Sequence, residues 1–200
     1  KRLLALPRES LIADLELVLQ DADARYEAYS ALDTEEKPLP LSLLSFPVHA
    51  AFLLAELGAT GSLGKLLRFL GKEPHKVAFW MGEHLSEDLW LPIFKLGKDN
   101  LERLQKFVRN HDADYLARSA ATYAVAQLAW HYSARRKEVF AWFESFFQYY
   151  LGNFQHDDEA SLLGNAISEV ANLRAKDLLE VIDELFQEDL VDASVCGSLL

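Results

Sequence analysis

Two short clusters of ionisable side chains are the first candidates for chemistry in this chain. His84, Glu87 and Asp88 fall within five residues, and His84 and Asp88 stand four apart, so they would share one face of a helix. Imidazole and carboxylate groups at this spacing can bind a metal ion. A zinc site needs three or four ligands, however, and the HExxH arrangement is absent. The pattern therefore favours a solvated acidic turn over a metal site.

The second cluster runs from His156 to Glu159 and carries three consecutive carboxylates at the predicted start of a helix. Acidic groups in a first turn accept hydrogen bonds from free backbone amides and complement the helix dipole. A calcium loop would instead need alternating oxygen ligands, a glycine turn and a distal glutamate. That spacing is missing, so we interpret the cluster as a helix cap.

Motifs for catalysis or cofactor binding are absent from the sequence. There is no GxSxG nucleophile motif, no P-loop and no GxGxxG phosphate-binding motif. The segment LGATGSLGK, which starts at Leu57, has three glycines and a lysine, but it falls between two predicted helices, whereas a nucleotide loop follows a strand. The single cysteine, Cys196, has no recognisable base beside it. We therefore expect a protein that is not an enzyme, with no catalytic residue, no metal site and no cofactor.

The elements that would carry these groups follow a repeat. The apolar pattern of an eleven-residue window recurs at offsets of 38, 39 and 39 residues, in SLGKLLRFLGK from Ser62, NLERLQKFVRN from Asn100, VFAWFESFFQY from Val139 and LLEVIDELFQE from Leu178. The second, fifth, eighth and ninth places are apolar in all four windows, which is the spacing of one helix face. The interval is closer to HEAT and armadillo units, of roughly 40 to 47 residues, than to shorter helical repeats.

We therefore predict an all-α fold, an α-solenoid of about four HEAT-like helix pairs with an N-terminal helical segment. Each window is predicted to be the second helix of a pair. The first helices are predicted over 47–57, 75–85, 113–132 and 157–173, with 86–99 as an insertion that folds into a short helix burying Trp90 or Phe94. Residues 1–41 form the N-terminal segment and a Pro-containing linker, and residues 42–200 form the array, within one structural domain overall.

Most of the chain, from about Leu43 to Leu200, resembles a bacterial family of unknown function with HEAT-like repeats, number 1186 in the domain-of-unknown-function series. The segments that carry the resemblance are HAAFLLAELGATGSLGKLLRFL, MGEHLSEDLWLPIFKLGKDNLERL, DADYLARSAATYAVAQLAWHY and LLEVIDELFQEDLVDAS. The resemblance implies the fold and supplies no catalytic residue. Members of the family often carry a cysteine-rich zinc motif after the repeats, and this sequence has none.

Composition limits the partners and the compartment. Half of the residues are apolar and the formal net charge is -11, so a core can be buried, while wrapping of a phosphate backbone is disfavoured. We expect no nucleic acid and no membrane partner, since no stretch approaches the roughly 18 to 20 apolar residues of a membrane span. A single cysteine fits a reducing compartment, so a cytoplasmic location is expected. The start without Met and the end in Leu199 and Leu200 suggest a piece of a longer protein.

Charge changes sign along the four windows. Counting Lys and Arg against Asp and Glu, the windows carry +3, +2, -1 and -4 in order. Second helices of a solenoid line one continuous face, so the gradient would orient an extended partner with its acidic part over the first two windows. The alternative is an ordinary solvated surface. The candidate binding residues on this face are Lys65, Arg68, Arg103, Lys106 and Arg109 at the basic end and Glu180, Asp183 and Glu184 at the acidic end.

The third window lies in an aromatic helix from Val139 to Phe154. Apolar side chains cover about half of its circumference, which fits an internal helix that touches neighbours on several sides. The alternative is an aromatic edge, formed by Trp142 and Tyr149, that is open to a partner peptide, because aromatic side chains are common interface anchors. Trp142 and Tyr149 therefore join the candidate binding residues.

These patterns favour a non-enzymatic helical-repeat scaffold that binds a protein or peptide partner. One alternative is a structural or regulatory domain of a longer chain that carries a C-terminal zinc-binding module. Another is an enzyme without a recognisable motif, which would need a convergent polar pocket. The identity of the partner, the pathway and the oligomeric state do not follow from the sequence.

Overall fold

The computed structural model describes residues 6–34 and 37–197, and this part of the chain is built from helices. Within it, the one β-type pairing is an isolated bridge between Thr34 and Lys37. The predicted all-α fold is confirmed. None of the helices in these residues has both the length and the apolarity needed to cross a membrane. Glu35, Glu36 and the final two leucines, on which the linker and the apolar end were predicted, lie outside the described residues.

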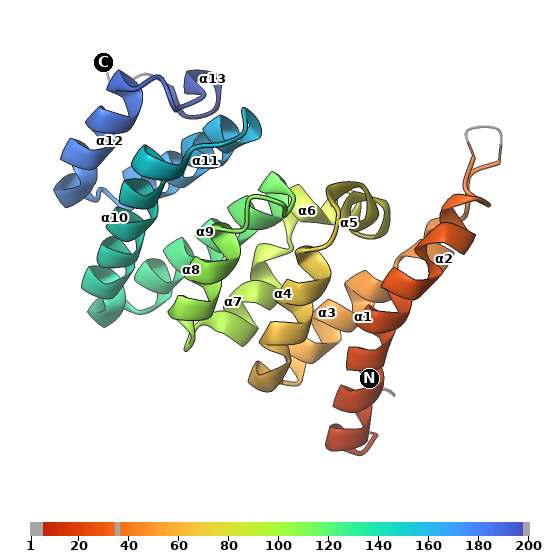
Figure 1. The fold of residues 1–200 in the computed structure, drawn as a ribbon. Coiled ribbons are helices and arrows are strands. Elements are labelled where there is room, and N and C mark those ends of the chain that lie inside the picture. The colour runs from red at the N-terminus through yellow and green to blue at the C-terminus, as the bar shows by residue number, and fades with distance from the viewer. Residues whose placement is uncertain (1–5, 35–36, 198–200) are drawn as a thin grey trace.

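The main helices form two layers of an elongated array, with α1 and α12 near opposite ends (Figure 1). The first layer holds α3 (Phe46–Glu56), α7 (Trp90–Gly97), α9 (Tyr115–His131), α11 (Asp158–Asn172) and α13 (Ala193–Cys196). The second layer holds α1 (Arg8–Ser30), α4 (Leu63–Leu70), α8 (Leu101–Val108), α10 (Arg136–Asn153) and α12 (Leu179–Gln187). Each first-layer helix contacts the next one, and in the second layer α1 contacts α4, α8 contacts α10 and α10 contacts α12. All four sequence windows are therefore second-layer helices.

The corners between the layers repeat a local structure. Three of the four window helices, α4, α10 and α12, are preceded by a single 3-10 turn, over Thr60–Ser62, Ser133–Arg135 and Lys176–Leu178. The remaining corner, between α7 and α8, is made by an asparagine cap: the side chain of Asn100 accepts a hydrogen bond from the backbone N–H of Arg103. Such caps satisfy amides that a helix start leaves without partners.

The second helix pair differs from its prediction. Its first-layer member is α7, because α7 contacts both α3 and α9. The segment 75–85, which was predicted for this place, lies elsewhere. That segment forms the short helices α5 (Pro74–Met81) and α6 (His84–Glu87), which are the insertion. The physical reason is burial, because Leu89 and Ile93 are completely buried between the neighbouring first-layer helices. The predicted short helix exists, but Trp90 and Phe94 are only half-buried.

The predicted N-terminal helical segment contains one long helix, α1. In α1, the side chains at helical spacing are buried against α3 and α4 and belong to the same apolar core as the rest of the array. Their spacing of three or four residues puts them on one face. These side chains are Leu11, Leu15, Leu19 and Ala22. Helix α1 therefore extends the second layer beyond the first window.

The apolar stripe of the four windows forms most of the second-layer side of the core. Phe143, Phe146 and Phe147 of α10 are completely buried, and the corresponding places in α4 are buried as well. Among the stripe residues that are less buried, Leu179 at the start of α12 is the most exposed, at 52%. Because α12 lies at the end of the array, its outer side has no further helix of this layer in the described residues.

Replacing Phe143 by alanine should lower the free energy of unfolding by about 3–5 kcal/mol, because it removes a large side chain from the packed interior and leaves a cavity. Leu179→Ala is the matched control, and it should cost less than about 1 kcal/mol because that side chain is already largely in water. Urea denaturation followed by circular dichroism measures both. Equal losses for the two variants would contradict the described burial.

Candidate functional site

A groove of about 820 Å³ lies between α4 and α8 on the second-layer surface. Its polar lining is dominated by cations, since Glu102 is the one carboxylate among the lining residues. Leu67 and Phe107 provide its apolar lining. The cations that line it are Arg68 from α4 and Arg103, Lys106 and Arg109 from the α8 segment. The structure thus brings together four of the five cations predicted for the basic end.

Gly64 brings two guanidinium groups together in this groove. A Cβ atom placed on Gly64 would lie 3.0 Å from Nη1 of Arg103 and 3.6 Å from Nη1 of Arg68, so both groups lie over the same glycine. Within the described residues, neither arginine nor Lys106 forms an ion pair. Like charges this close repel each other, so an anionic group bound between them would be favoured.

Two lysines of the first window interact with α1 instead of remaining free for a partner. Lys65 forms an ion pair with Glu16, and Nζ of Lys72 lies 2.9 Å from the Asp23 carboxylate. Burial raises the pKa of the Glu16 carboxyl, but hydrogen bonds from Lys65 and Ser62 outweigh it and hold this pKa below its usual value. The basic end is therefore smaller than the count of charges in the window predicts, because α1 neutralises part of it.

Arg109 is fixed in place by α10. Its guanidinium Nη2 donates hydrogen bonds to the backbone carbonyl of Ser145, at 3.0 Å, and to its hydroxyl, at 2.9 Å. The same guanidinium lies 4.7 Å from the centre of the Tyr149 ring, which is a cation–π distance. Arg109 therefore supplies a rigid positive charge at one end of the groove, whereas Arg68 and Arg103 are exposed.

The predicted aromatic edge is wrong for Trp142. Its side chain is 5% exposed, its ring is stacked on Phe146, and its indole Nε1–H donates to the backbone carbonyl of Leu101 at 3.1 Å. The cause is that α10 has α8 on one side and α12 on the other, so this side chain is interior. Tyr149 is half-buried, and its hydroxyl lies 2.9 Å from Nε2 of His111.

The acidic residues of the last window lie elsewhere on the array. Glu180, Asp183 and Glu184 are exposed on α12, and α10 separates this helix from the groove (Figure 1). The Asp183 carboxylate accepts a hydrogen bond from the side-chain amide of Gln187 at 2.6 Å. The predicted residues therefore form two separate patches of opposite charge and not one site.

An ion pair in the core joins Arg118 of α9 to Glu159 of α11, and the sequence interpretation missed it. Both side chains are completely buried, and Nη2 of Arg118 lies 2.8 Å from the Glu159 carboxylate. The guanidinium also donates from Nε to the backbone carbonyl of Val108 at 3.0 Å and from Nη2 to the hydroxyl of Tyr150. The imidazole of His111 contacts the same carboxylate oxygen. Four segments therefore converge on one buried pair.

The other oxygen of Glu159 binds the backbone just before α11. It accepts hydrogen bonds from the backbone N–H groups of Gln155, at 2.8 Å, and His156, at 3.4 Å. Burial raises the pKa of this carboxyl, but the hydrogen bonds from Arg118, Gln155 and His111 outweigh it and hold the pKa below its usual value. Asp158 and Glu159 do lie in the first turn of α11, but the N-cap residue Asp157 makes no capping hydrogen bond, and the amides that Glu159 binds precede the helix.

A signal for the buried pair was present in the sequence. Arg118 follows Ala117 and precedes Ala121, and both alanines are completely buried. A long cation on a helix face of alanines must either reach solvent or find a buried partner. The partner could not be identified, because Glu159 is 41 residues further along the chain.

His84 and Asp88 of the first ionisable cluster share one helix face, as their spacing predicts. Nδ1 of His84 lies 2.8 Å from the Asp88 carboxylate at the end of α6. In the part of the chain that the structure describes, no group of three or more His, Cys, Asp or Glu residues is arranged to hold a metal ion.

The family model described as "Protein of unknown function (DUF1186)" matches residues 34–197. The chain belongs to this family. Neither the curated proteins nor the solved structures yield a match. The match to DUF1186 covers the helices from α2 (Leu41–Leu44) to α13, and it assigns no activity to the groove or to the buried pair.

In this DUF1186 member, Glu159→Gln should lower the free energy of unfolding at pH 7 by about 3–5 kcal/mol, because it leaves the Arg118 charge buried without its counterion. A depressed carboxyl pKa contributes stability above the unfolded-state value of about 4.3 and loses it as the pH falls through the folded-state value. The difference in free energy of unfolding between Glu159→Gln and the unmodified protein should therefore shrink in acid. Urea denaturation at several pH values measures it.

Glu184→Gln makes the same chemical change on an exposed carboxylate of α12 and serves as the control. We expect its stability to equal that of the unmodified protein at every pH. A Glu159→Gln variant that is just as stable would show that the buried pair does not contribute to folding.

Proposed function

We propose that this protein is a non-enzymatic helical scaffold that binds an acidic segment of a protein or peptide in the groove between α4 and α8. The observation that carries the proposal is the placement of Arg68 and Arg103 over Gly64 without a carboxylate partner in the described residues. A carboxylate of the partner would take this position. Arginine pairs with carboxylates through two parallel hydrogen bonds, which makes such contacts both strong and directional.

The charges of the groove favour a partner that is acidic rather than generally polar. The chain has an overall charge of -11, so a region in which four cations face one carboxylate differs sharply from the average surface. Local positive potential increases the rate of encounter with an acidic partner and selects against basic ones. The groove is also open and long enough for several residues of an extended segment, since it continues along α8 from Glu102 to Asn110.

Two features of the groove indicate how it would bind a partner. Arg109 is held by Ser145 and Tyr149, so its position does not have to be fixed at the moment of binding. Leu67 and Phe107 at the bottom are 7% and 6% exposed, so they provide little apolar area. Affinity would therefore come mainly from charged hydrogen bonds, and it should fall as salt screens them.

The double variant Arg68→Glu/Arg103→Glu should weaken binding of a short poly-glutamate peptide at least about tenfold, which corresponds to about 1.4 kcal/mol. The reason is that both cations of the Gly64 position become anions. The control variant, Lys137→Glu/Lys176→Glu, changes the net charge equally at two exposed lysines outside the groove. Fluorescence anisotropy of labelled poly-glutamate, with poly-glutamine as the neutral peptide, measures binding.

Both double variants should remain folded, because exposed substitutions usually change stability by about 0.5 kcal/mol or less. We expect the control variant to bind within about twofold of the unmodified protein. If the two double variants lose affinity equally, only the overall charge matters and the groove is not the binding site.

Gly64→Ala tests the geometry without changing any charge. The new methyl group would lie 3.0 Å from Nη1 of Arg103, so this flexible side chain must move away. Alanine is favoured over glycine inside a helix by about 0.5–1 kcal/mol, so stability should be kept or raised. Binding of poly-glutamate should nevertheless become weaker. Unchanged affinity in this variant would show that the position of Arg103 over Gly64 is not needed.

A further inference from the structure

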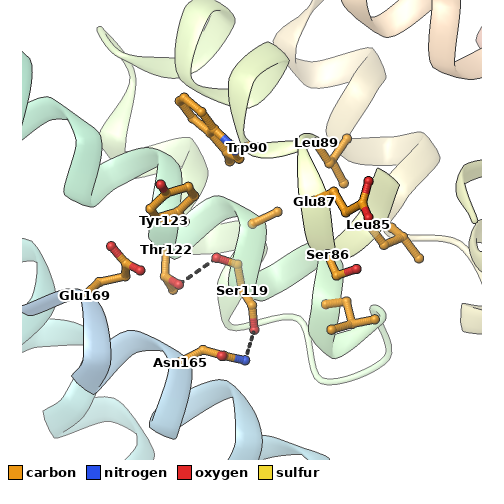
Figure 2. Close-up of a pocket in the computed structure, with 12 residues that line it drawn as sticks. Leu85, Ser86, Glu87, Leu89, Trp90, Ser119, Thr122, Tyr123, Asn165 and Glu169 are labelled. Atoms are coloured by element: carbon orange, nitrogen blue, oxygen red, sulfur yellow. Dashed lines mark hydrogen bonds between the residues drawn. The ribbon is translucent and has the colours of Figure 1, made fainter. Parts of the chain in front are cut away.

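The first-layer surface carries a second and different cavity. A cleft of about 390 Å³ lies between α6 and the start of α7 on one side and α11 on the other, with α9 between them (Figure 2). This volume is in the range of small-molecule sites, which are commonly about 300–1,000 Å³. The cleft exists because the insertion places α6 beside α9, where α6 forms one of the walls.

Two carboxylates line the cleft from opposite sides. Glu169 comes from α11 and Glu87 comes from α6, and the polar side chains of α9 lie between them in Figure 2. Among the residues that line the cleft there is no lysine, arginine or histidine. Neither glutamate forms an ion pair within the described part of the chain. The cleft therefore has two carboxyl groups and no positive charge of its own to pair with them.

An aromatic pair forms another side of the cleft. The rings of Trp90 and Tyr123 meet edge to face, with centroids 5.0 Å apart and an angle of 72° between the planes. Both residues line the cleft and both are half-buried. Aromatic faces attract cations and also pack against hydrocarbon chains. Together with an unneutralised carboxylate, they recognise an organic cation better than an inorganic one.

The polar floor of the cleft is held by one hydrogen bond between α11 and α9 and by another within α9. The side-chain amide of Asn165 donates to the Ser119 hydroxyl at 3.3 Å, and the Thr122 hydroxyl donates to the backbone carbonyl of Ser119 at 2.8 Å (Figure 2). These bonds leave the carboxylate of Glu169 without a hydrogen-bond partner of its own in the described residues. The Asn165 and Ser119 side chains are therefore held in place, and the Glu169 carboxylate beside them can accept a hydrogen bond from a ligand.

We propose that this cleft binds a small aliphatic amine, whose ammonium group pairs with Glu169 and whose hydrocarbon chain packs against Trp90 and Tyr123. Glu87 on the opposite wall is placed to meet a second ammonium group if the amine carries one. This site is on the other layer from the basic groove and does not depend on the function proposed for that groove. The same chemistry is offered by a free amine and by a lysine side chain of another protein.

Proton binding should be linked to amine binding at this site. Burial raises the pKa of the Glu169 carboxyl to about 7, so near neutral pH it is only partly ionised. The other titratable groups that line the cleft are Glu87 of α6 and Tyr123 of α9. An ammonium group favours the ionised form of Glu169, so binding should release protons and should strengthen as the pH rises through 7.

Isothermal titration calorimetry with cadaverine tests the proposal, with the neutral diol of the same chain length as the control ligand. We expect saturable binding of cadaverine with a Kd of about 1 mM or lower and no saturable binding of the diol. Glu169→Gln should weaken binding at least about tenfold, whereas Glu180→Gln, the same change on exposed α12, should leave it within about twofold. Trp90→Leu should weaken it as well.

Parallel titrations with Nα-acetyl-lysine amide, which keeps its side-chain ammonium group, distinguish the two sources of the amine. Binding of either probe that requires Glu169 supports the proposal, and a preference for the lysine derivative identifies a protein side chain as the occupant. Comparable binding of the diol, undiminished binding by a folded Glu169→Gln variant, or no saturable binding of either probe up to about 10 mM would overturn it.

Discussion

The buried ion pair between Arg118 of α9 and Glu159 of α11 also binds the end of α8 and a tyrosine of α10, so it joins four helices of the array. A completely buried guanidinium and carboxylate are tolerated only when their geometry is fixed by further hydrogen bonds, because each charge alone would cost several kcal/mol to bury. Here those bonds involve the carbonyl at the end of α8, a tyrosine of α10 and a backbone amide just before α11. The pair therefore sets how the second and third windows sit relative to the last first-layer helices. It also continues outwards, since His111 links Glu159 to Tyr149, on which Arg109 is stacked.

Two surfaces of opposite charge follow from this arrangement. In the second layer, α4 and α8 hold cations that form no ion pair within the described residues, while α1 neutralises the neighbouring lysines. In the first layer, the insertion of α5 and α6 opens a cleft in which Glu169 has no counterion within the described residues. A scaffold that binds an acidic segment on one layer and an amine on the other would combine partner capture with a response to a small cation. The two sites share α9 as a support, because it contacts both α8 and α11.

The part of the fold that was predictable from the sequence is the part that depends on periodic burial. The four windows are all second-layer helices, and Phe143 occupies the interior as its place in the stripe implies. Periodicity does not distinguish a repeat helix from an inserted one, so α5 and α6 were mistaken for the first helix of the second pair, and only packing against α3 and α9 identifies α7. Likewise, the positive charges of Arg68 and Arg103 could be read from the sequence, but their closeness over Gly64 depends on which helices are neighbours. The burial of Trp142 in the core depends on the same neighbours. Whether the repeats are HEAT units stays a prediction.

The groove between α4 and α8 is the proposed contact surface for an acidic partner. Hydrogen–deuterium exchange of the protein with and without bound poly-glutamate locates the contact most directly, since it reports protection of backbone amides along the whole chain. We expect slower exchange confined to residues 63–71 and 101–110, the two segments that contain the lining residues of this groove. Protection centred on α6, α9 and α11, or on the helices around α12, would contradict it.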